Sequence, residues 1–196
     1  MAKNYKWGAK KDERALHIVL FVSRNKDNAD VADFKQRRES FVTKDAFDSD
    51  VLKEKFNTFV KFGVKGEMCR MYYSVNARNE DYVRKALMKQ FVDEPELNVC
   101  AIGSFCAKHA AKAEASATKR WMFDFDLDDA KAVKQFCEDI KDIDATVECT
   151  IRKTPNCYAV VVNHGFDTRK LMEKWKDVDV SVKKDDLLCV DWKTKK

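Results

Sequence analysis

Short apolar segments alternate with amphipathic ones along the chain, and this pattern predicts most of its secondary structure. Buried strands are expected at 15–23 and 68–76, where apolar and β-branched residues run together. Helices are expected where apolar residues recur every three or four positions, at 51–63, 79–95 and 97–115. The polar segment 24–50 carries neither pattern, so we expect a loop with a short helix there.

The second half of the chain is more regular and predicts a βαββαβ unit. Its expected elements are strand 119–127, helix 129–141, strand 144–152, strand 157–163, helix 167–176 and strand 187–192, with room for a short strand at 178–182. We therefore expect an α+β protein with two units that form one combined core. An N-terminal α/β unit (1–116) would pack on a C-terminal RNA-recognition-like antiparallel sheet unit (117–196).

Composition narrows the class of protein. The 196 residues are 45% hydrophobic with a net charge of +5, which permits a polyanionic partner. No apolar run approaches the ~18 residues needed to span a membrane, so no membrane partner is expected. The seven cysteines include no Cys-x-x-Cys pair, so we expect reduced thiols in a cytoplasmic protein rather than disulfides or a zinc site. Neither of the glycine-rich motifs that bind phosphate, G-x-x-x-x-G-K-[ST] and G-x-G-x-x-G, occurs in the chain.

The segment "KRWMFDFDLDD" places aspartates inside an apolar strand. Because side chains alternate across a strand, Asp124 and Asp126 share one face, while the aromatic residues share the other. Two carboxylates about 7 Å apart repel each other unless a cation lies between them, as a divalent metal does. The alternative is that Asp128 or Asp129 caps the next helix and that the other acids only make the sheet face soluble.

A third carboxylate follows from the expected strand order. In a βαββαβ sheet of order 4-1-3-2, the first strand lies beside the fourth, and the strand 187–192 carries Asp191. If Asp191 shares the face of Asp124 and Asp126, three carboxylates converge and could hold two Mg²⁺ or Mn²⁺ ions for phosphoryl transfer. The hypothesis of a metal-dependent transferase requires this convergence.

On these residues the chain resembles the archaeo-eukaryotic primase superfamily, the primase-polymerases, over roughly residues 15–196. "FDFD" (Asp124, Asp126) matches the first motif of that superfamily, and "CVD" (Asp191) matches its third. The resemblance implies that these three aspartates are catalytic and bind metal. It further implies nucleoside triphosphates as substrates and a DNA or RNA template as partner. The small size is similar to that of viral members, which implies the host cytoplasm as location.

The second motif departs from the pattern of the superfamily. "TPNCYAVVV" resembles it, but Ala159 stands where the superfamily has a histidine that contacts the triphosphate. The resemblance implies that the pocket for the nucleotide is lined by Thr154, Asn156 and Tyr158. A cation such as Lys153 or Arg152 would then replace the histidine, unless the protein is a degenerate relative that does not catalyse transfer.

The segment "YYSVNAR" is similar to a strand and loop that supplies basic groups to the cleft in some members of the superfamily. That similarity makes Arg78 the candidate contact for the template or the triphosphate.

Two other classes of protein remain open. "MFDFDLDDA" also matches the signature of haloacid-dehalogenase-type phosphatases, whose nucleophilic aspartate follows a strand in a parallel sheet. The βαββαβ unit alone could instead be a non-catalytic module that binds nucleic acid. Dependence on a divalent cation separates these classes, because binding by such a module should not change when metal is removed.

Overall fold

The computed structural model describes residues 15–196 and contains two four-stranded antiparallel sheets. The N-terminal sheet has the order β2-β1-β3-β8, and the C-terminal sheet has the order β5-β6-β4-β7. The strands of the N-terminal sheet are β1 (His17–Ser23), β2 (Arg37–Thr43), β3 (Met68–Ser74) and β8 (Leu187–Thr194). Those of the C-terminal sheet are β4 (Trp121–Phe125), β5 (Cys149–Lys153), β6 (Tyr158–Val162) and β7 (Val180–Lys183). The α+β fold predicted from the sequence is confirmed.

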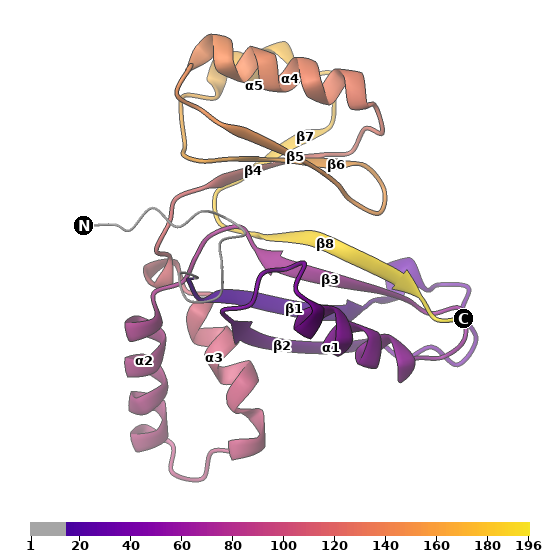
Figure 1. Ribbon diagram of the computed structural model, residues 1–196, viewed down its shortest axis with the longest axis vertical. Coiled ribbons are helices and arrows are strands. Elements are labelled where there is room, and N and C mark those ends of the chain that lie inside the picture. Colours follow the sequence, from indigo (N-terminus) through magenta and orange to yellow (C-terminus); the bar gives the residue numbers. More distant parts are fainter. Residues whose placement is uncertain (1–14) are drawn as a thin grey trace.

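The described residues also form five α-helices (Figure 1). They are α1 (Asp50–Lys61), α2 (Glu80–Asp93), α3 (Ile102–Ala110), α4 (Ala130–Ile143) and α5 (Arg169–Lys174). Ser49, Asn79 and Asp129 each accept a hydrogen bond from a backbone N–H in the first turn of α1, α2 and α4, so the cap predicted at Asp128 or Asp129 is Asp129. None of the described helices is both long and apolar enough to cross a membrane.

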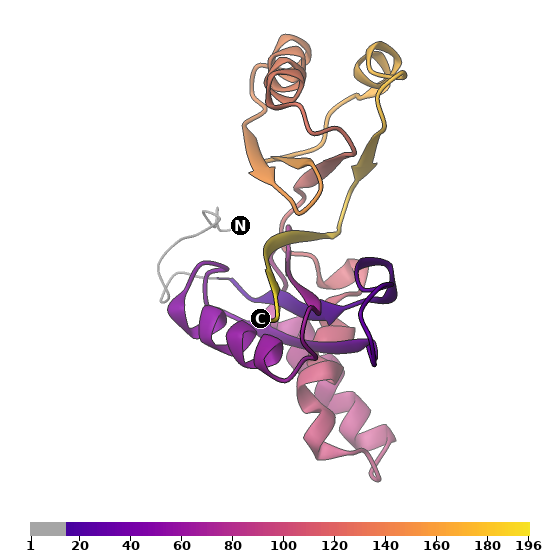
Figure 2. The same ribbon diagram turned by 90° about the vertical axis from the view of Figure 1, so that its right-hand side faces the viewer.

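The C-terminal sheet is covered by helices on its outer face only. α4 and α5 pack there on the aromatic side of β4, where Phe123, Phe125 and Phe136 are fully buried. The other face turns toward the N-terminal sheet, and Met122, Ala159 and Leu188 join the two sheets in a small apolar cluster. The strand order, read as β7-β4-β6-β5, is the 4-1-3-2 order expected for a βαββαβ unit. Figure 2 shows the resulting stack of helices and sheets.

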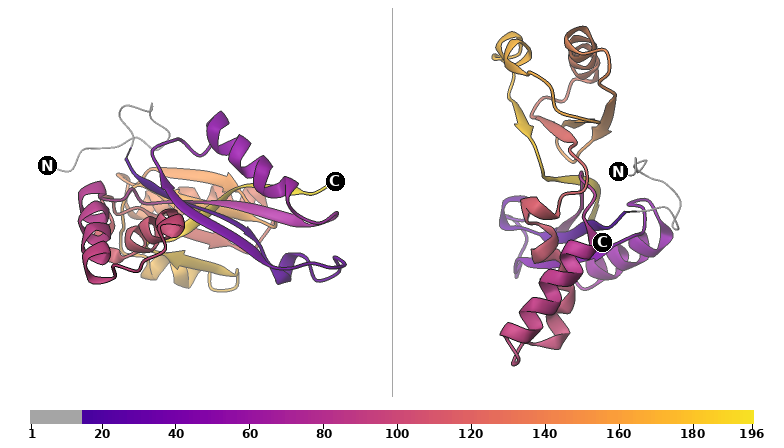
Figure 3. Two further views of the ribbon diagram at one scale, coloured as in Figure 1. Left: turned by 90° about the horizontal axis from the view of Figure 1, so that it is seen from below. Right: turned by 90° about the vertical axis from the view of Figure 1, so that its left-hand side faces the viewer.

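The N-terminal sheet is covered unequally on its two faces. α1 packs on the face formed by Val19, Phe21 and Met71 and completes the largest cluster of this half. α3 packs on the opposite face, against Leu16 and Ile18. The hairpin of α2 and α3 projects beyond the edge of this sheet (Figure 3). The inner face of the N-terminal sheet is therefore shared between α3 and the C-terminal sheet.

Two predictions about strands are wrong. The segment 24–50 was expected to lack strands, yet it contains β2, which forms an edge of the N-terminal sheet beside β1. The strand at 187–192 was expected to close the C-terminal sheet, but β8 pairs with β3 in the N-terminal sheet. The short strand β7 takes the fourth position beside β4 instead. Residues 187–194 therefore lie outside the sheet of the unit in which we expected them.

One buried amide joins the connections between the two sheets. The Nδ2 group of Asn76 donates to the carbonyl oxygens of Arg120 (3.0 Å) and Lys184 (3.3 Å) and to Oδ1 of Asp185 (3.2 Å). Its Oδ1 accepts from the backbone N–H of Arg120 (2.7 Å) and from the hydroxyl of Thr118 (2.9 Å). Asn76 is 1% exposed. Water therefore has little access to the groups that bind Asn76 and could not readily replace these hydrogen bonds. Asn76 thereby fixes both chain segments that pass between the sheets.

Replacing Asn76 by Ala should lower the free energy of unfolding by about 3 kcal/mol, because it removes the partner of the Arg120 N–H and of the carbonyl oxygens of Arg120 and Lys184. Chemical denaturation monitored by circular dichroism measures this loss. Asn57→Ala is the matched control, since Asn57 is exposed and accepts one bond from Lys193. Equal stability of the two variants would contradict the role assigned to Asn76.

Candidate functional site

The candidate site begins with the alternation of side chains along β4. Phe123 and Phe125 point into the core beneath α4, whereas Met122 and Asp124 point toward the N-terminal sheet. Asp126 follows the strand, and its backbone N–H donates to the carbonyl oxygen of Asp179 (3.0 Å). Asp124 is half-buried and Asp126 is exposed. The predicted separation of the carboxylates from the aromatic face of the strand is confirmed.

Small neighbours leave open space around Asp124. Antiparallel pairing places Ala159 of β6 opposite it on one side and Ser181 of β7 opposite it on the other. Residues paired in this way share a face of the sheet, so neither neighbour fills the volume above the carboxylate. Ala159, which replaces the histidine of the resembling motif, thus helps to form a hollow.

This hollow is part of a cavity of about 530 Å³ between the two sheets. Its wall on the C-terminal sheet contains Asp124 and Asp126, with Thr154 and Asn156 at the turn before β6. Its wall on the N-terminal sheet contains the inward-facing residues of β1 and β3 and the first residues of β8, namely Leu20, Val22, Arg70, Tyr72, Leu187, Leu188 and Cys189. A volume of this size suits a ligand as large as a nucleotide.

Four cations line the same cavity: Arg24, Lys26, Arg70 and Lys183. Lys183 extends from β7 on the same face as Met122, its paired neighbour on β4. The other three extend from the N-terminal unit, across the cavity from the two carboxylates. The site therefore has an acidic side and a basic side.

Arg70 is the most deeply placed of these cations. Its side chain is nearly buried, and an Nη2 group donates to Oδ1 of Asp27 (2.5 Å). Asp27 also accepts from Nε of Arg24 (2.6 Å). Burial alone would raise the pKa of Asp27, but the bonds from Arg24 and Arg70 outweigh it and hold that pKa below its usual value. The Nε–H of Arg70 is buried and has no hydrogen-bond partner among residues 15–196.

The carboxylate of Asp124 has an unfavourable environment in its charged form. Burial raises its pKa most, and the negative charge of Asp126 raises it further. Lys183 acts in the opposite direction, while Asp186 and Asp179 add to the increase. A divalent cation beside Asp124 and Asp126 would remove this repulsion. Mg²⁺ is commonly held by one or two protein carboxylates together with phosphate oxygens of the substrate, so the residues present fit such an ion.

Asp191 does not join this pair, and the expectation of three converging aspartates is wrong. Asp191 pairs with Met71, which lies beneath α1, so Asp191 lies on the face of the N-terminal sheet that points away from the cavity. There it accepts from the backbone N–H of Trp192 (2.8 Å) and lies 3.5 Å from Nζ of Lys193. No group of three acidic, histidine or cysteine side chains suited to a metal forms within the described part of the chain. Asp191 lies away from Asp124 and Asp126 because its strand, β8, pairs with β3 and not with β4.

Three other predicted site residues also lie outside the cavity. Arg78 is 4% exposed and forms a two-bond ion pair with Asp185 (2.7 and 2.8 Å), which helps to hold the connections between the sheets. Tyr158 pairs with Phe125 and packs on the core beneath α4. Lys153 pairs with Asp128 and lies 4.4 Å from the centre of the Tyr158 ring. By contrast, Thr154 and Asn156 line the cavity, and their contact with a nucleotide stays a prediction.

Sequence reasoning missed the basic side of the site. Its clearest signal was Arg70, a charge within the apolar strand "MCRMYYS", because a charge inside a buried strand requires a partner. Arg24 and Lys26 lie in the connection after β1, and their contribution depends on how the two sheets face each other. Arg152, the other cation considered, packs 4.7 Å from the centre of the Phe47 ring.

Asp124→Asn should raise the melting temperature at pH 8 by about 2 °C, because it removes a charge that the folded state disfavours. A raised pKa in the folded state lowers stability as pH rises through that pKa. The gain should therefore disappear when the pH falls low enough to protonate Asp124 in both states. Differential scanning calorimetry of the parent, Asp124→Asn and the exposed control Asp142→Asn checks this. A variant less stable than its parent at pH 8 would contradict the electrostatic assignment.

The chain matches no protein-family model, no curated protein and no solved structure in the comparisons made. Its function is therefore argued from its own residues and their geometry.

Proposed function

We propose that the protein is primase-polymerase-like and binds a nucleoside triphosphate with Mg²⁺ or Mn²⁺ in the cavity between its two sheets. The observation that carries this proposal is the division of the cavity into two sides. Asp124 and Asp126 form the acidic side, with Lys183 on the same sheet, and Arg24, Lys26 and Arg70 form the basic side across the cavity. A complex of metal and triphosphate needs both, since carboxylates hold the ion and cations neutralise the remaining phosphate charge.

The phosphate contacts follow from where the cations lie. Lys183 shares a sheet face with Asp124, so it is the cation best placed to reach a phosphate beside the bound ion. It would supply the charge that the second motif lacks at Ala159. The buried, unpartnered Nε–H of Arg70 would donate to a phosphate oxygen from the opposite wall. Thr154 and Asn156 add polar groups to the lining of the cavity.

Templated nucleotidyl transfer is the second candidate function. Asp191 cannot be the third metal ligand, because it lies on the other face of its sheet. Asp186 favours a different arrangement, since it lines the same cavity and its charge raises the pKa of Asp124. In the reaction, a 3′-hydroxyl of nucleic acid would lose its proton to water and its oxygen would bond to the α-phosphorus, while the bond from that phosphorus to the bridging oxygen breaks and pyrophosphate leaves. Asp186 would supply the third oxygen ligand required there.

The phosphatase alternative is wrong on topology. A haloacid-dehalogenase-type site requires its aspartate strand in a parallel sheet, but β4 pairs antiparallel with both β6 and β7. The nucleic-acid-binding module stays a distinct alternative. It differs from our proposal in needing neither a divalent cation nor the two aspartates.

Titration calorimetry with Mn²⁺ and a non-hydrolysable nucleoside triphosphate tests the proposal. Asp124→Asn combined with Asp126→Asn should weaken binding more than about tenfold, since even changes beside a metal ligand cost that much. Replacing Lys26 and Lys183 together by Ala should also weaken binding of the nucleotide, while the protein still binds Mn²⁺. Glu138→Gln with Asp142→Asn is the control, because both residues are exposed on α4. Binding by the double aspartate variant as tight as that of the control would overturn the assignment.

Primer extension with Mn²⁺ separates the two candidate functions. Asp186→Asn should abolish incorporation if transfer occurs, while calorimetry still detects the bound nucleotide. A parent protein that binds the nucleotide but adds none to any primer would restrict the function to binding. Extension that is undiminished in Asp186→Asn would exclude Asp186 as the third ligand.

A further inference from the structure

Exposed apolar side chains gather on the outside of the hairpin formed by α2 and α3. Nine large apolar side chains are exposed among residues 15–196, and four of them, Met88, Val92, Val99 and Ile102, belong to this hairpin. The hairpin projects beyond the edge of the N-terminal sheet, so neither sheet covers these side chains (Figures 1 and 3). Such a group of apolar side chains on a charged surface is typical of a contact with another molecule.

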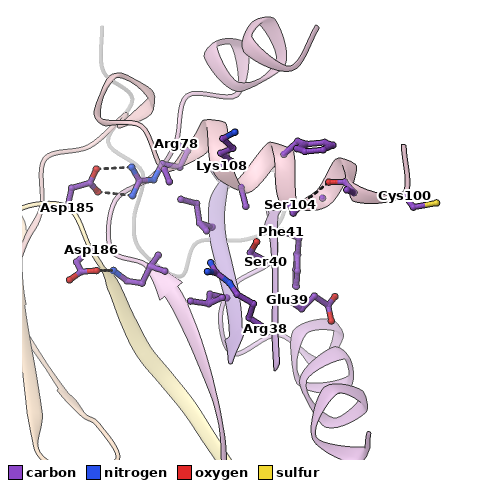
Figure 4. A pocket seen from close by; sticks show the side chains of 18 residues that line it. Arg38, Glu39, Ser40, Phe41, Arg78, Cys100, Ser104, Lys108, Asp185 and Asp186 are labelled. Carbon is purple, nitrogen blue, oxygen red and sulfur yellow. Dashed lines mark hydrogen bonds and ion pairs between the residues drawn. The ribbon is translucent and has the colours of Figure 1, made fainter. Parts of the chain in front are cut away.

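The inner side of the hairpin has a different character. There α3 borders a cavity of about 850 Å³, whose other wall is formed by β1 and β2 (Figure 4). Charged side chains of both signs line this cavity, namely Arg38, Arg78 and Lys108 with Glu39, Asp185 and Asp186. The lining therefore selects neither sign of charge in a ligand, whereas the outer side of the hairpin has an ordered pattern of charges.

The exposed face of α2 carries an apolar pair between charges of opposite sign. Met88 and Val92 are four residues apart, so they lie on one face of the helix, about 6 Å from each other. Lys85 lies on the same face about one turn before Met88. Glu94 and Glu96 follow Val92 at the tip of the hairpin, and both are exposed. The order along this face is therefore positive, apolar, apolar and negative.

The acidic end of α2 has no ion-paired cation among the described residues. Its last turn contains Asp93 and no basic residue, although the C-terminal end of a helix favours positive charge. Arg84 is engaged by Asp81 nearer the start of the helix. Lys85 and Glu96 form no ion pair within residues 15–196. A cation from outside the chain would therefore stabilise this end of α2.

A second copy of the chain supplies that cation if the two α2 helices pack antiparallel. A two-fold axis midway between Met88 and Val92 places Met88 of each copy against Val92 of the other. The same axis brings position 85 of one copy opposite position 95 of the other, so Lys85 lies beside Glu94 and Glu96 of the second copy. A parallel arrangement would bring like charges together. The exposed face of α2 is thus complementary to itself in the antiparallel orientation alone.

We propose that the protein forms a two-fold dimer through the outer face of this hairpin, with Met88 and Val92 at the centre and Lys85 against Glu96 at each end. α2 has 14 residues and spans about 21 Å, which is short for a dimer interface. We therefore expect a dissociation constant of about 1–100 µM. The hairpin contains no residue of the cavity of the proposed metal site, so the dimer does not rest on the proposed function.

Sedimentation equilibrium of the full chain at about 5–500 µM, in EDTA and without nucleotide, tests the dimer. Met88→Lys with Val92→Lys should raise the dissociation constant at least about tenfold, since like charges would replace apolar contacts. Val51→Lys with Phe62→Lys is the matched control and should associate like the parent, because these exposed apolar residues lie on α1 and at its C-terminal end. A parent that stays monomeric over this range would overturn the dimer, as would equal association of the Met88/Val92 variant and the control.

An exchange of charges tests the antiparallel orientation without changing an apolar residue. Lys85→Glu alone and Glu96→Lys alone should each raise the dissociation constant about tenfold at low salt, because each dimer contains two such contacts. The two changes combined should restore association, since opposite charges face each other again. Circular dichroism of each variant verifies folding. A folded double variant that associates no better than the single variants would exclude the antiparallel pairing.

Discussion

The placement of the two sheets depends on the buried amide of Asn76. This side chain holds both the segment that enters β4 and the segment that leaves β7, and the Arg78–Asp185 pair lies beside it. An apolar link between the sheets is the small cluster around Met122 and Leu188. The distance between the acidic and basic sides of the candidate site is thus set by hydrogen bonds formed outside it.

The site itself combines charges that the fold brings together at a cost. Asp124 lies beside Asp126 in a partly buried position, and Arg70 is nearly buried with one N–H unpaired. Charged groups in such positions destabilise a protein unless a ligand completes their interactions. These two features are complementary, since the carboxylates of Asp124 and Asp126 attract a cation and the unpaired N–H of Arg70 attracts an anion. A metal bound to a polyphosphate satisfies both at once.

The sequence predicted the local features of this protein better than its long-range ones. Alternation along β4 placed Asp124 and Asp126 on one face, and the resemblance of the second motif pointed to Thr154 and Asn156, which line the same cavity. The error over Asp191 arose because two strands competed for the place beside β4. β8 is longer and more apolar than β7, but neither property determines pairing. To predict the basic side of the site, one would have to know how the two sheets face each other. No local sequence pattern contains that information.

The pairing of β8 with β3 makes the C-terminal unit an insertion within the N-terminal one. Its strands β4 to β7 emerge from the ribosome before the N-terminal sheet receives its last member. Until then β3 presents an unpaired edge, which is the kind of surface that recruits strands from other chains. Completion of the N-terminal sheet therefore waits until β8 has been synthesised, and a nascent chain must keep β3 unoccupied while the inserted unit folds.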